Sequence, residues 1–151
     1  MNAPNQQKTP NAIQLKGISK CFILLTLLCL FANTAQAQIH ASCTHRDYYK
    51  YNDMTEEFEY QNGYDENSMF KINTTLTMFE HTTPDISSSY YVTESEFDKD
   101  EKTLSMEAVS DVGNKYHCIF DINNDKISFL FEKEGVVQLL VFTVKKFWTE
   151  E

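Results

Sequence analysis

The sequence lacks the motifs that mark nucleophilic catalysis and helical membrane spans. It contains no Gly-x-Ser-x-Gly sequence, and its longest apolar run, Cys21–Phe31, is shorter than the roughly 20 residues that a spanning helix needs. Glycine and proline are scarce, with four and three copies, so Asn and Asp must supply most turns. We find neither internal repeats nor low-complexity segments. These absences disfavour an enzyme and indicate a small globular domain.

The first 37 residues have the layout of a cleavable secretory signal. Lys8, Lys16 and Lys20 are the only charged residues before position 46, the apolar run follows them, and Ala35-x-Ala37 offers a cleavage site. An uncleaved anchor is the alternative, which the short apolar run disfavours. We expect residues 1–37 to be removed on export, leaving residues 38–151 as a single domain in the periplasm or outside the cell.

Basic charge is scarce in the predicted domain. All 22 acidic residues follow position 37, whereas three of the 13 basic residues precede it, which gives the domain a formal net charge of −12. Such a surface repels nucleic acid and anionic membranes and attracts basic proteins over a distance. Acidity that only keeps an exported protein soluble is the alternative. We expect no nucleic-acid partner and no membrane insertion after cleavage.

Only two cysteines, Cys43 and Cys118, remain after the predicted cleavage. An even count in an oxidising compartment predicts a disulfide between them. It would close a loop of about 75 residues and stabilise the domain by roughly 3–4 kcal/mol. Two free buried thiols are the alternative. His45 should share the face of Cys43 and His117 the face opposite Cys118, so the bridge would hold these imidazoles apart and disfavour a zinc site.

Apolar side chains recur at every second position of the domain, as they do in half-buried antiparallel strands. Leu104, Met106 and Ala108 share one face, and Met69–Phe79 is predicted to form one long strand. Asn62-Gly63 suits a tight hairpin. The predicted strands lie near 44–51, 55–61, 68–79, 88–97, 102–110, 114–122, 126–132 and 136–147. This pattern predicts an all-β antiparallel meander of about eight strands in a small closed or nearly closed barrel, with a β-sandwich as the alternative.

Asp121, Asn123 and Asp125 form a weak calcium candidate of the Asp-x-Asn-x-Asp type. Lys126 replaces the glycine that makes the sharp turn of such loops, and the flanking residues alternate as strands. The pattern therefore favours a polar hairpin turn, and we expect no metal or other cofactor.

Carboxylates and tyrosines are the remaining candidates for a binding site. Adjacent tyrosines such as Tyr90-Tyr91 must place one ring on each face of a strand. The predicted acidic and aromatic patch consists of Tyr90, Glu94, Glu96, Asp98, Asp100 and Glu101. A solvated strand and turn would explain the same charges.

Three functions fit these features. The first is an exported, non-enzymatic binding protein that captures a basic partner, such as an inhibitor or immunity-type antagonist of a protein acting on the envelope. Small exported lysozyme inhibitors are similar in gross profile, being short disulfide-bearing β-barrels, and the similarity is one of kind. The alternative is a small barrel that carries an apolar ligand. An enzyme of unrecognised type fits least.

Overall fold

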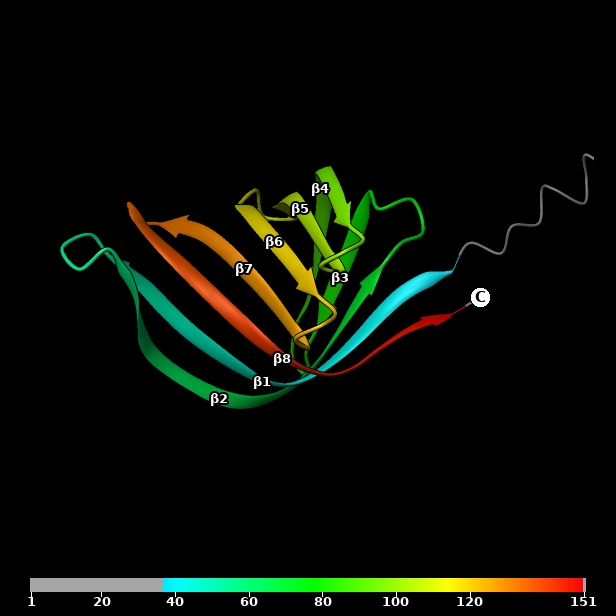
Figure 1. Ribbon diagram of the computed structural model, residues 1–151, viewed down its shortest axis with the longest axis horizontal. Helices are drawn as coiled ribbons and strands as arrows, with labels where there is room; N and C mark the ends of the chain where they lie inside the picture. The colour runs from blue at the N-terminus through cyan, green and yellow to red at the C-terminus, as the bar shows by residue number, and fades with distance from the viewer. Residues whose placement is uncertain (1–36, 151) are drawn as a thin grey trace, which may run out of the picture. The chain divides into compact units, whose positions relative to one another are not determined.

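The computed structural model describes residues 37–150, which fold as a closed antiparallel β-barrel. Each strand pairs with its neighbours in sequence, and β8 closes the barrel on β1 (Figure 1). The all-β meander of eight strands is thus confirmed, in its barrel form. Residues 1–36 of the predicted signal lie outside the described residues. The strands are β1 (Gln38–Asn52), β2 (Glu57–Ile72), β3 (Met78–Thr82), β4 (Ser87–Asp98), β5 (Thr103–Ser110), β6 (Lys115–Asp121), β7 (Lys126–Lys133) and β8 (Val136–Glu150).

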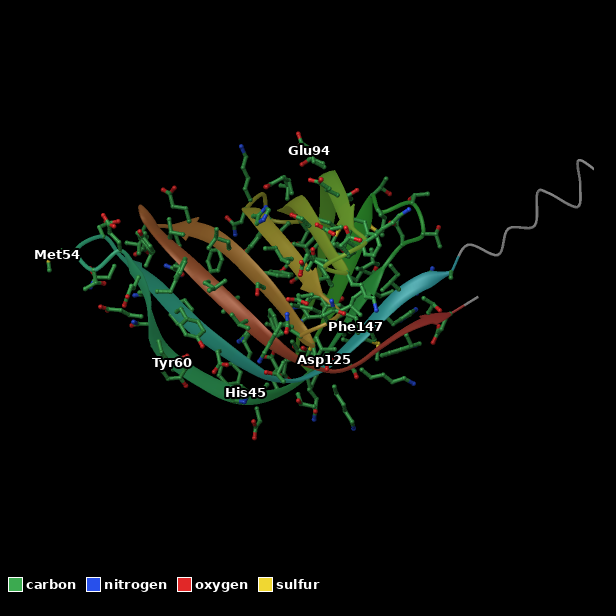
Figure 2. All side chains as sticks on the ribbon, in the orientation of Figure 1. His45, Met54, Tyr60, Glu94, Asp125 and Phe147 are labelled. Atoms are coloured by element: carbon green, nitrogen blue, oxygen red, sulfur yellow. The ribbon has the colours of Figure 1, made fainter. Side chains whose placement is uncertain are left out.

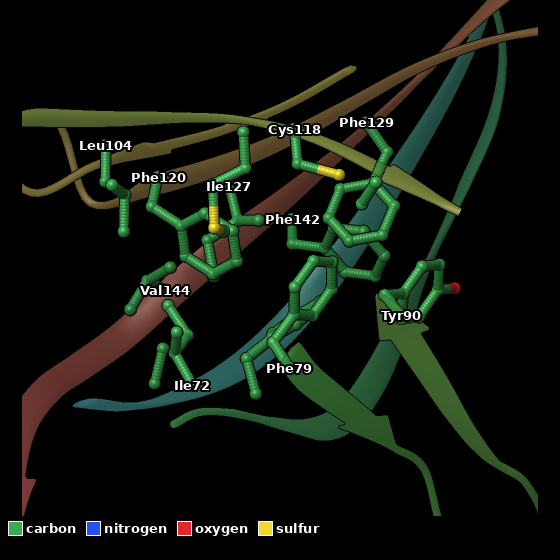
Figure 3. Close-up of a cluster of buried hydrophobic side chains, with 14 of the residues drawn as sticks. Ile72, Phe79, Tyr90, Leu104, Cys118, Phe120, Ile127, Phe129, Phe142 and Val144 are labelled. Carbon is green, nitrogen blue, oxygen red and sulfur yellow. The ribbon is translucent and has the colours of Figure 1, made fainter. Parts of the chain in front are cut away.

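Phenylalanine rings fill the interior of the barrel (Figure 3). Phe70 is fully buried, and its ring lies 5.1 Å from that of Phe142, 5.6 Å from that of Phe129 and 5.8 Å from that of Phe120. Edge-on contacts of this kind suit the ring quadrupole, and burying each ring contributes roughly 1.5–3 kcal/mol. The interior is therefore a packed core, as the inward Phe, Leu and Met residues of the alternating pattern predict.

Strand lengths are unequal, and this shapes both ends of the barrel. β2 pairs with β3 only from Met69 to Ile72, whereas it pairs with β1 almost along its whole length. The first part of β2, from Glu57 to Ser68, therefore has a strand on one side only. The β1–β2 hairpin projects beyond the shorter strands (Figure 1).

Two details of the predicted strand pattern are wrong. Asn62 and Gly63 are not a turn, because they pair with Tyr48 and Asp47 inside the β1–β2 ladder. The hairpin turns instead at residues 53–56, where the backbone N–H of Glu56 donates to Asn52 O. Glycine thus marks a place of close approach here rather than a change of direction.

The predicted strand over residues 68–79 is split by a turn at residues 73–77. The side-chain oxygen of Asn73 accepts hydrogen bonds from the backbone N–H groups of Thr77 and Met78, which closes the turn. The chain reverses there and forms the short strand β3, in which Phe79 rather than Met78 is fully buried. Thr74 and Leu76 continue the two-residue alternation of the sequence through this turn. The alternation alone therefore could not reveal the turn.

The predicted disulfide is also wrong, because Cys43 and Cys118 are both free thiols. Both side chains point into the core, with Cys43 on β1 and Cys118 on β6. These strands are not hydrogen-bonded neighbours, since β2 and β8 flank β1 while β5 and β7 flank β6. The two thiols instead occupy the core as small apolar groups, which corresponds to the alternative that the sequence left open.

Candidate functional site

Most of the predicted acidic patch comes together on the outer surface of β4 and β5. Leu104 and Met106 of β5 are buried. The residues that alternate with them, Thr103, Ser105 and Glu107, therefore point outward. A β-bulge between Val92 and Glu94 brings Glu94 opposite Glu107, and the regular ladder then sets Glu96 and Asp98 on the same face. We call the following set the acidic face: Glu94, Glu96, Asp98, Asp100, Glu101 and Glu107.

The acidic face contains a shallow hollow beside β6. Glu94, Glu96 and Glu107 line it together with His117, whose Nδ1 lies 2.6 Å from Glu107 Oε1. The Asp98 carboxylate accepts hydrogen bonds from the backbone N–H groups of Asp100 and Glu101, and these bonds fix the β4–β5 turn. Figure 2 shows Glu94 at the outside of the barrel. The hollow offers carboxylates to a ligand, and Ser105 also lines it, with its Oγ 3.5 Å from His117 Nε2.

Tyr90 does not belong to this patch, which corrects the sequence prediction. Its side chain is only 8% exposed and its ring stacks on Phe79 inside the barrel, with 4.6 Å between the centroids. Burial raises the pKa of the Tyr90 hydroxyl. The outward ring of the pair is Tyr91, which is 56% exposed. The expectation that this pair divides between two faces is confirmed, but the sequence did not tell which ring faces outward.

The calcium candidate forms the β6–β7 turn. Asp121 accepts the backbone N–H of Asn124 at 3.0 Å through Oδ1 and the Asn124 amide at 2.8 Å through Oδ2. Asn123 donates to the carbonyl oxygen of Glu101, and Asp125 adopts a positive φ of 52°. These side chains serve the turn. Within residues 37–150, no group of three or more His, Cys, Asp or Glu side chains could hold a metal ion.

The projecting hairpin carries paired aromatic rings on the side away from the core. Tyr49 contacts Tyr60 edge-on at 5.5 Å, and Tyr51 contacts Phe58 in the same way at 5.2 Å. Tyr60 is 58% exposed, and Met54 at the tip is 91% exposed (Figure 2). We call Tyr49, Tyr51, Phe58 and Tyr60 the hairpin ladder. Asp53 and Glu56 lie in the turn at its tip, whereas Glu57 and Glu59 alternate with Phe58 along β2 and therefore point to the opposite face of the strand.

His45 lies beside the hairpin ladder. Its orientation corrects the prediction that it shares the face of Cys43. β-bulges on either side of Cys43 shift the alternation, so that His45 points outward while Cys43 points inward. His45 Nδ1 lies 2.8 Å from Asp65 and its Nε2 lies 3.2 Å from Asp47. The hydrogen bond with Asp65 is the main reason that the pKa of His45 is raised, with a smaller contribution from Asp47.

Sequence reasoning missed a polar pocket between β2 and the β3–β4 turn. Its charged and polar walls include Arg46, Glu66, His81 and Asp85, and its volume is about 400 Å³. Arg46 Nη2 lies 3.4 Å from Glu66 Oε2. Arg46 is the only arginine of the chain, and this was the one signal that could have drawn attention to the site.

An apolar pocket lies at the other end of the barrel. Its walls include Leu76, Leu104 and Phe147, and its volume is about 270 Å³ (Phe147 is labelled in Figure 2). Phe97 and Ile122, which are partly exposed, lie at the same pocket. Among residues 37–150, no polar side chain lines this pocket. The two ends of the barrel thus offer pockets of opposite chemistry.

No family model matches the chain, and neither a curated protein nor a solved structure is found to be similar to it. Among residues 37–150, no helix is long and apolar enough to cross a membrane. The class that the fold defines is a closed eight-stranded antiparallel barrel.

Proposed function

We propose that this domain is an exported, non-enzymatic binding protein that captures a basic protein partner on the hairpin ladder. The observation that carries the proposal is the pairing of exposed aromatic rings along a projecting hairpin that has carboxylates at its tip. Export is inferred from the layout of residues 1–37.

The composition of the ladder fits the centre of a protein interface. Tyrosine and phenylalanine supply large contact areas with few rotatable bonds, and they are enriched at interface centres together with methionine. Tyr60, Phe58 and Met54 are exposed without a partner surface within the described residues. The edge-on contacts to Tyr49 and Tyr51 fix the rings before binding, which reduces the entropy lost on association.

The acidic residues would make the domain selective for positively charged proteins. Carboxylates at the hairpin tip would meet Lys and Arg side chains at the rim of the interface, where the contact stays hydrated. The acidic face on β4 and β5 lies elsewhere on the barrel and acts through its field, which steers a basic protein during approach. The two surfaces therefore make separable contributions: the hairpin ladder sets the dissociation rate, and the acidic face sets the association rate.

The test uses hen lysozyme and cytochrome c as basic probe proteins and measures association and dissociation rates at about 50 and about 200 mM salt. We expect saturable binding that weakens with salt. Replacing Phe58 and Tyr60 by alanine should weaken binding at least about tenfold through faster dissociation. The matched control is Tyr91→Ala, which removes an equally exposed tyrosine from β4 and should leave both rates unchanged.

The double variant Glu94→Gln/Glu96→Gln separates steering from contact. It should slow association at low salt and leave dissociation unchanged. Binding that ignores salt, or that Tyr91→Ala weakens as much as the ladder variant does, would contradict the proposal.

A second candidate function, carriage of an apolar ligand, rests on the apolar pocket. A cavity of about 150 Å³ with apolar walls suffices for a benzene-sized ligand, and this pocket is larger. Its lining by Leu76, Leu104 and Phe147 offers nothing to a polar group, so an occupant would enter with a ring or alkyl chain.

N-Phenyl-1-naphthylamine is a suitable probe for that candidate, because its fluorescence rises when it is transferred out of water. Ile122→Trp would fill the pocket and should abolish saturable binding, whereas Val112→Trp, at an exposed position of the β5–β6 turn, is the control. Equal binding by both variants would exclude the apolar pocket as the site.

A further inference from the structure

The polar pocket exists because β2 runs past the end of β3. The β2–β3 ladder stops at Met69 and Thr82, and beyond this point Tyr64 and Glu66 of β2 face the β3–β4 turn across an opening. Arg46 of β1 and His81 of β3 complete the walls. Strands β1, β2 and β3 and the β3–β4 turn therefore contribute to one concave site. Its volume, about 400 Å³, lies in the range of small-molecule sites.

Two buried polar atoms in this pocket have no hydrogen-bond partner within the described residues. They are Oε1 of Glu66 and Nε2 of His81. His81 is only 8% exposed, and the Glu66 side chain is 13% exposed. Buried polar groups are nearly always paired in folded proteins, because an unpaired group loses its hydration without compensation. Both residues line the pocket, and the described residues give neither atom a partner.

Arg46 brings a fixed positive charge with spare donors. Its guanidinium carbon lies 4.7 Å from the centroid of the Tyr64 ring and 5.9 Å from that of Phe142, so the group is held against two rings. Among residues 37–150, its one ion pair is the 3.4 Å contact with Glu66. A guanidinium has five N–H donors in a planar fork, which suits a carboxylate bound through two oxygens.

His81 is held in place and uncharged. Its ring stacks on Phe70 with 4.2 Å between centroids and contacts Phe142 edge-on at 5.1 Å. Burial, followed by the charge of Arg46, lowers the pKa of His81 to about 4. The neutral ring can donate one hydrogen bond through Nε2 when the proton sits on that nitrogen.

We propose that this pocket binds a small zwitterion of the α-amino-acid type. The ammonium group donates to Glu66 Oε1, and the carboxylate accepts from Arg46 and from His81 Nε2. Each unpaired buried atom thereby gains a partner. The ring of Tyr64 and the side chain of Ile86 offer an apolar wall to the rest of the ligand. A purely cationic ligand is disfavoured because Arg46 would repel it, and a purely anionic ligand because Glu66 and Asp85 would.

The test measures binding of L-phenylalanine to the exported protein by titration calorimetry, with N-acetyl-L-phenylalanine and L-phenylalaninamide as probes that each lack one charge. We expect saturable binding of phenylalanine with a dissociation constant of about 1 mM or below and at least about tenfold weaker binding of either blocked form. Glu66→Gln should weaken phenylalanine binding at least about tenfold, because an amide replaces the charged acceptor. The control Glu94→Gln removes a carboxylate from the acidic face and should change nothing.

The comparison of the three probes needs no variant, so it stays decisive if Glu66→Gln fails to fold. No saturable binding of phenylalanine to the folded protein would mean that ordered water is the sole occupant and would overturn the proposal. Equal binding of all three probes would also overturn it, since the two charges would then play no part. Neither result bears on the binding of basic proteins by the hairpin ladder.

Discussion

Gly63 lies opposite Asp47 in the β1–β2 ladder, at a position where a Cβ atom would collide with the Asp47 carboxylate. The same Cβ would lie 2.9 Å from the Tyr60 hydroxyl and 3.0 Å from His45 Nε2. The absence of a side chain at this position therefore makes room for the polar cluster at the base of the hairpin ladder.

Gly63→Ala should destabilise the domain by about 1 kcal/mol, although alanine in a strand normally gains roughly 0.5–1 kcal/mol over glycine. The added methyl group must displace Asp47 or His45 from their contact. Urea unfolding measures the effect. In an Asp47→Ala background, the same substitution should become neutral or stabilising. A destabilisation that persists in that background would show that the collision with Asp47 is not its cause.

Replacing Asp65 by Asn should lower the raised pKa of His45, because the hydrogen bond with Asp65 is the main cause of the rise. A raised folded-state pKa stabilises the protein fully below the unfolded value of about 6.5, and this contribution disappears as the pH rises through the folded pKa. The stability advantage of the wild type over Asp65→Asn should therefore shrink as the pH rises above about 6.5. An NMR titration of the His45 ring checks the shift, with Asp85→Asn as a control that leaves it unchanged.

His81 should change the stability of the fold in the opposite direction as the pH changes. Its folded-state pKa of about 4 lies below the unfolded value, so the unfolded chain binds the proton more tightly. The stability that this group contributes is fully present above about pH 6.5 and is lost as the pH falls toward 4, by an amount on the order of 3 kcal/mol.

Comparison with His81→Phe isolates this contribution, because phenylalanine keeps a ring against Phe70 and does not titrate. Denaturant unfolding at several pH values should show the wild type losing stability faster than the variant as the pH falls from 6.5 to 4. Parallel curves for the two proteins would refute the assignment.

Cys43 and Cys118 should react slowly with iodoacetamide in the native protein and both react after unfolding without a reductant. Burial raises the pKa of the Cys43 thiol to about 12 and also raises that of Cys118, so little thiolate forms at neutral pH. Mass spectrometry of the protein would count the modified residues. No modification in denaturant without reductant would show a disulfide and contradict the free thiols of the structure.

The sequence predicted the architecture because the dominant signal, alternation of apolar residues, is the physical cause of a barrel with a filled interior. Leu104, Met106 and Ala108 are buried as expected. Local turn chemistry was less informative, since Asn62-Gly63 has two physical explanations and only the tertiary contacts of Gly63 distinguish them.

The candidate sites were harder to predict than the barrel. One-residue bulges reverse the facing of every following side chain, and they decide where His45 and Glu94 point. The polar pocket depends on the unequal lengths of β2 and β3, so the meeting of Arg46, Glu66 and His81 cannot be derived from spacing in the sequence.

The unpaired stretch of β2 has a consequence for self-association. Backbone groups from Glu57 to Ser68 could accept a strand from a second copy of this protein. Glu57, Glu59 and Asp65 lie along the same stretch, and edge-to-edge pairing of two copies would bring these negative charges together. Like charges at these positions oppose that pairing and so disfavour self-association through this edge of the sheet.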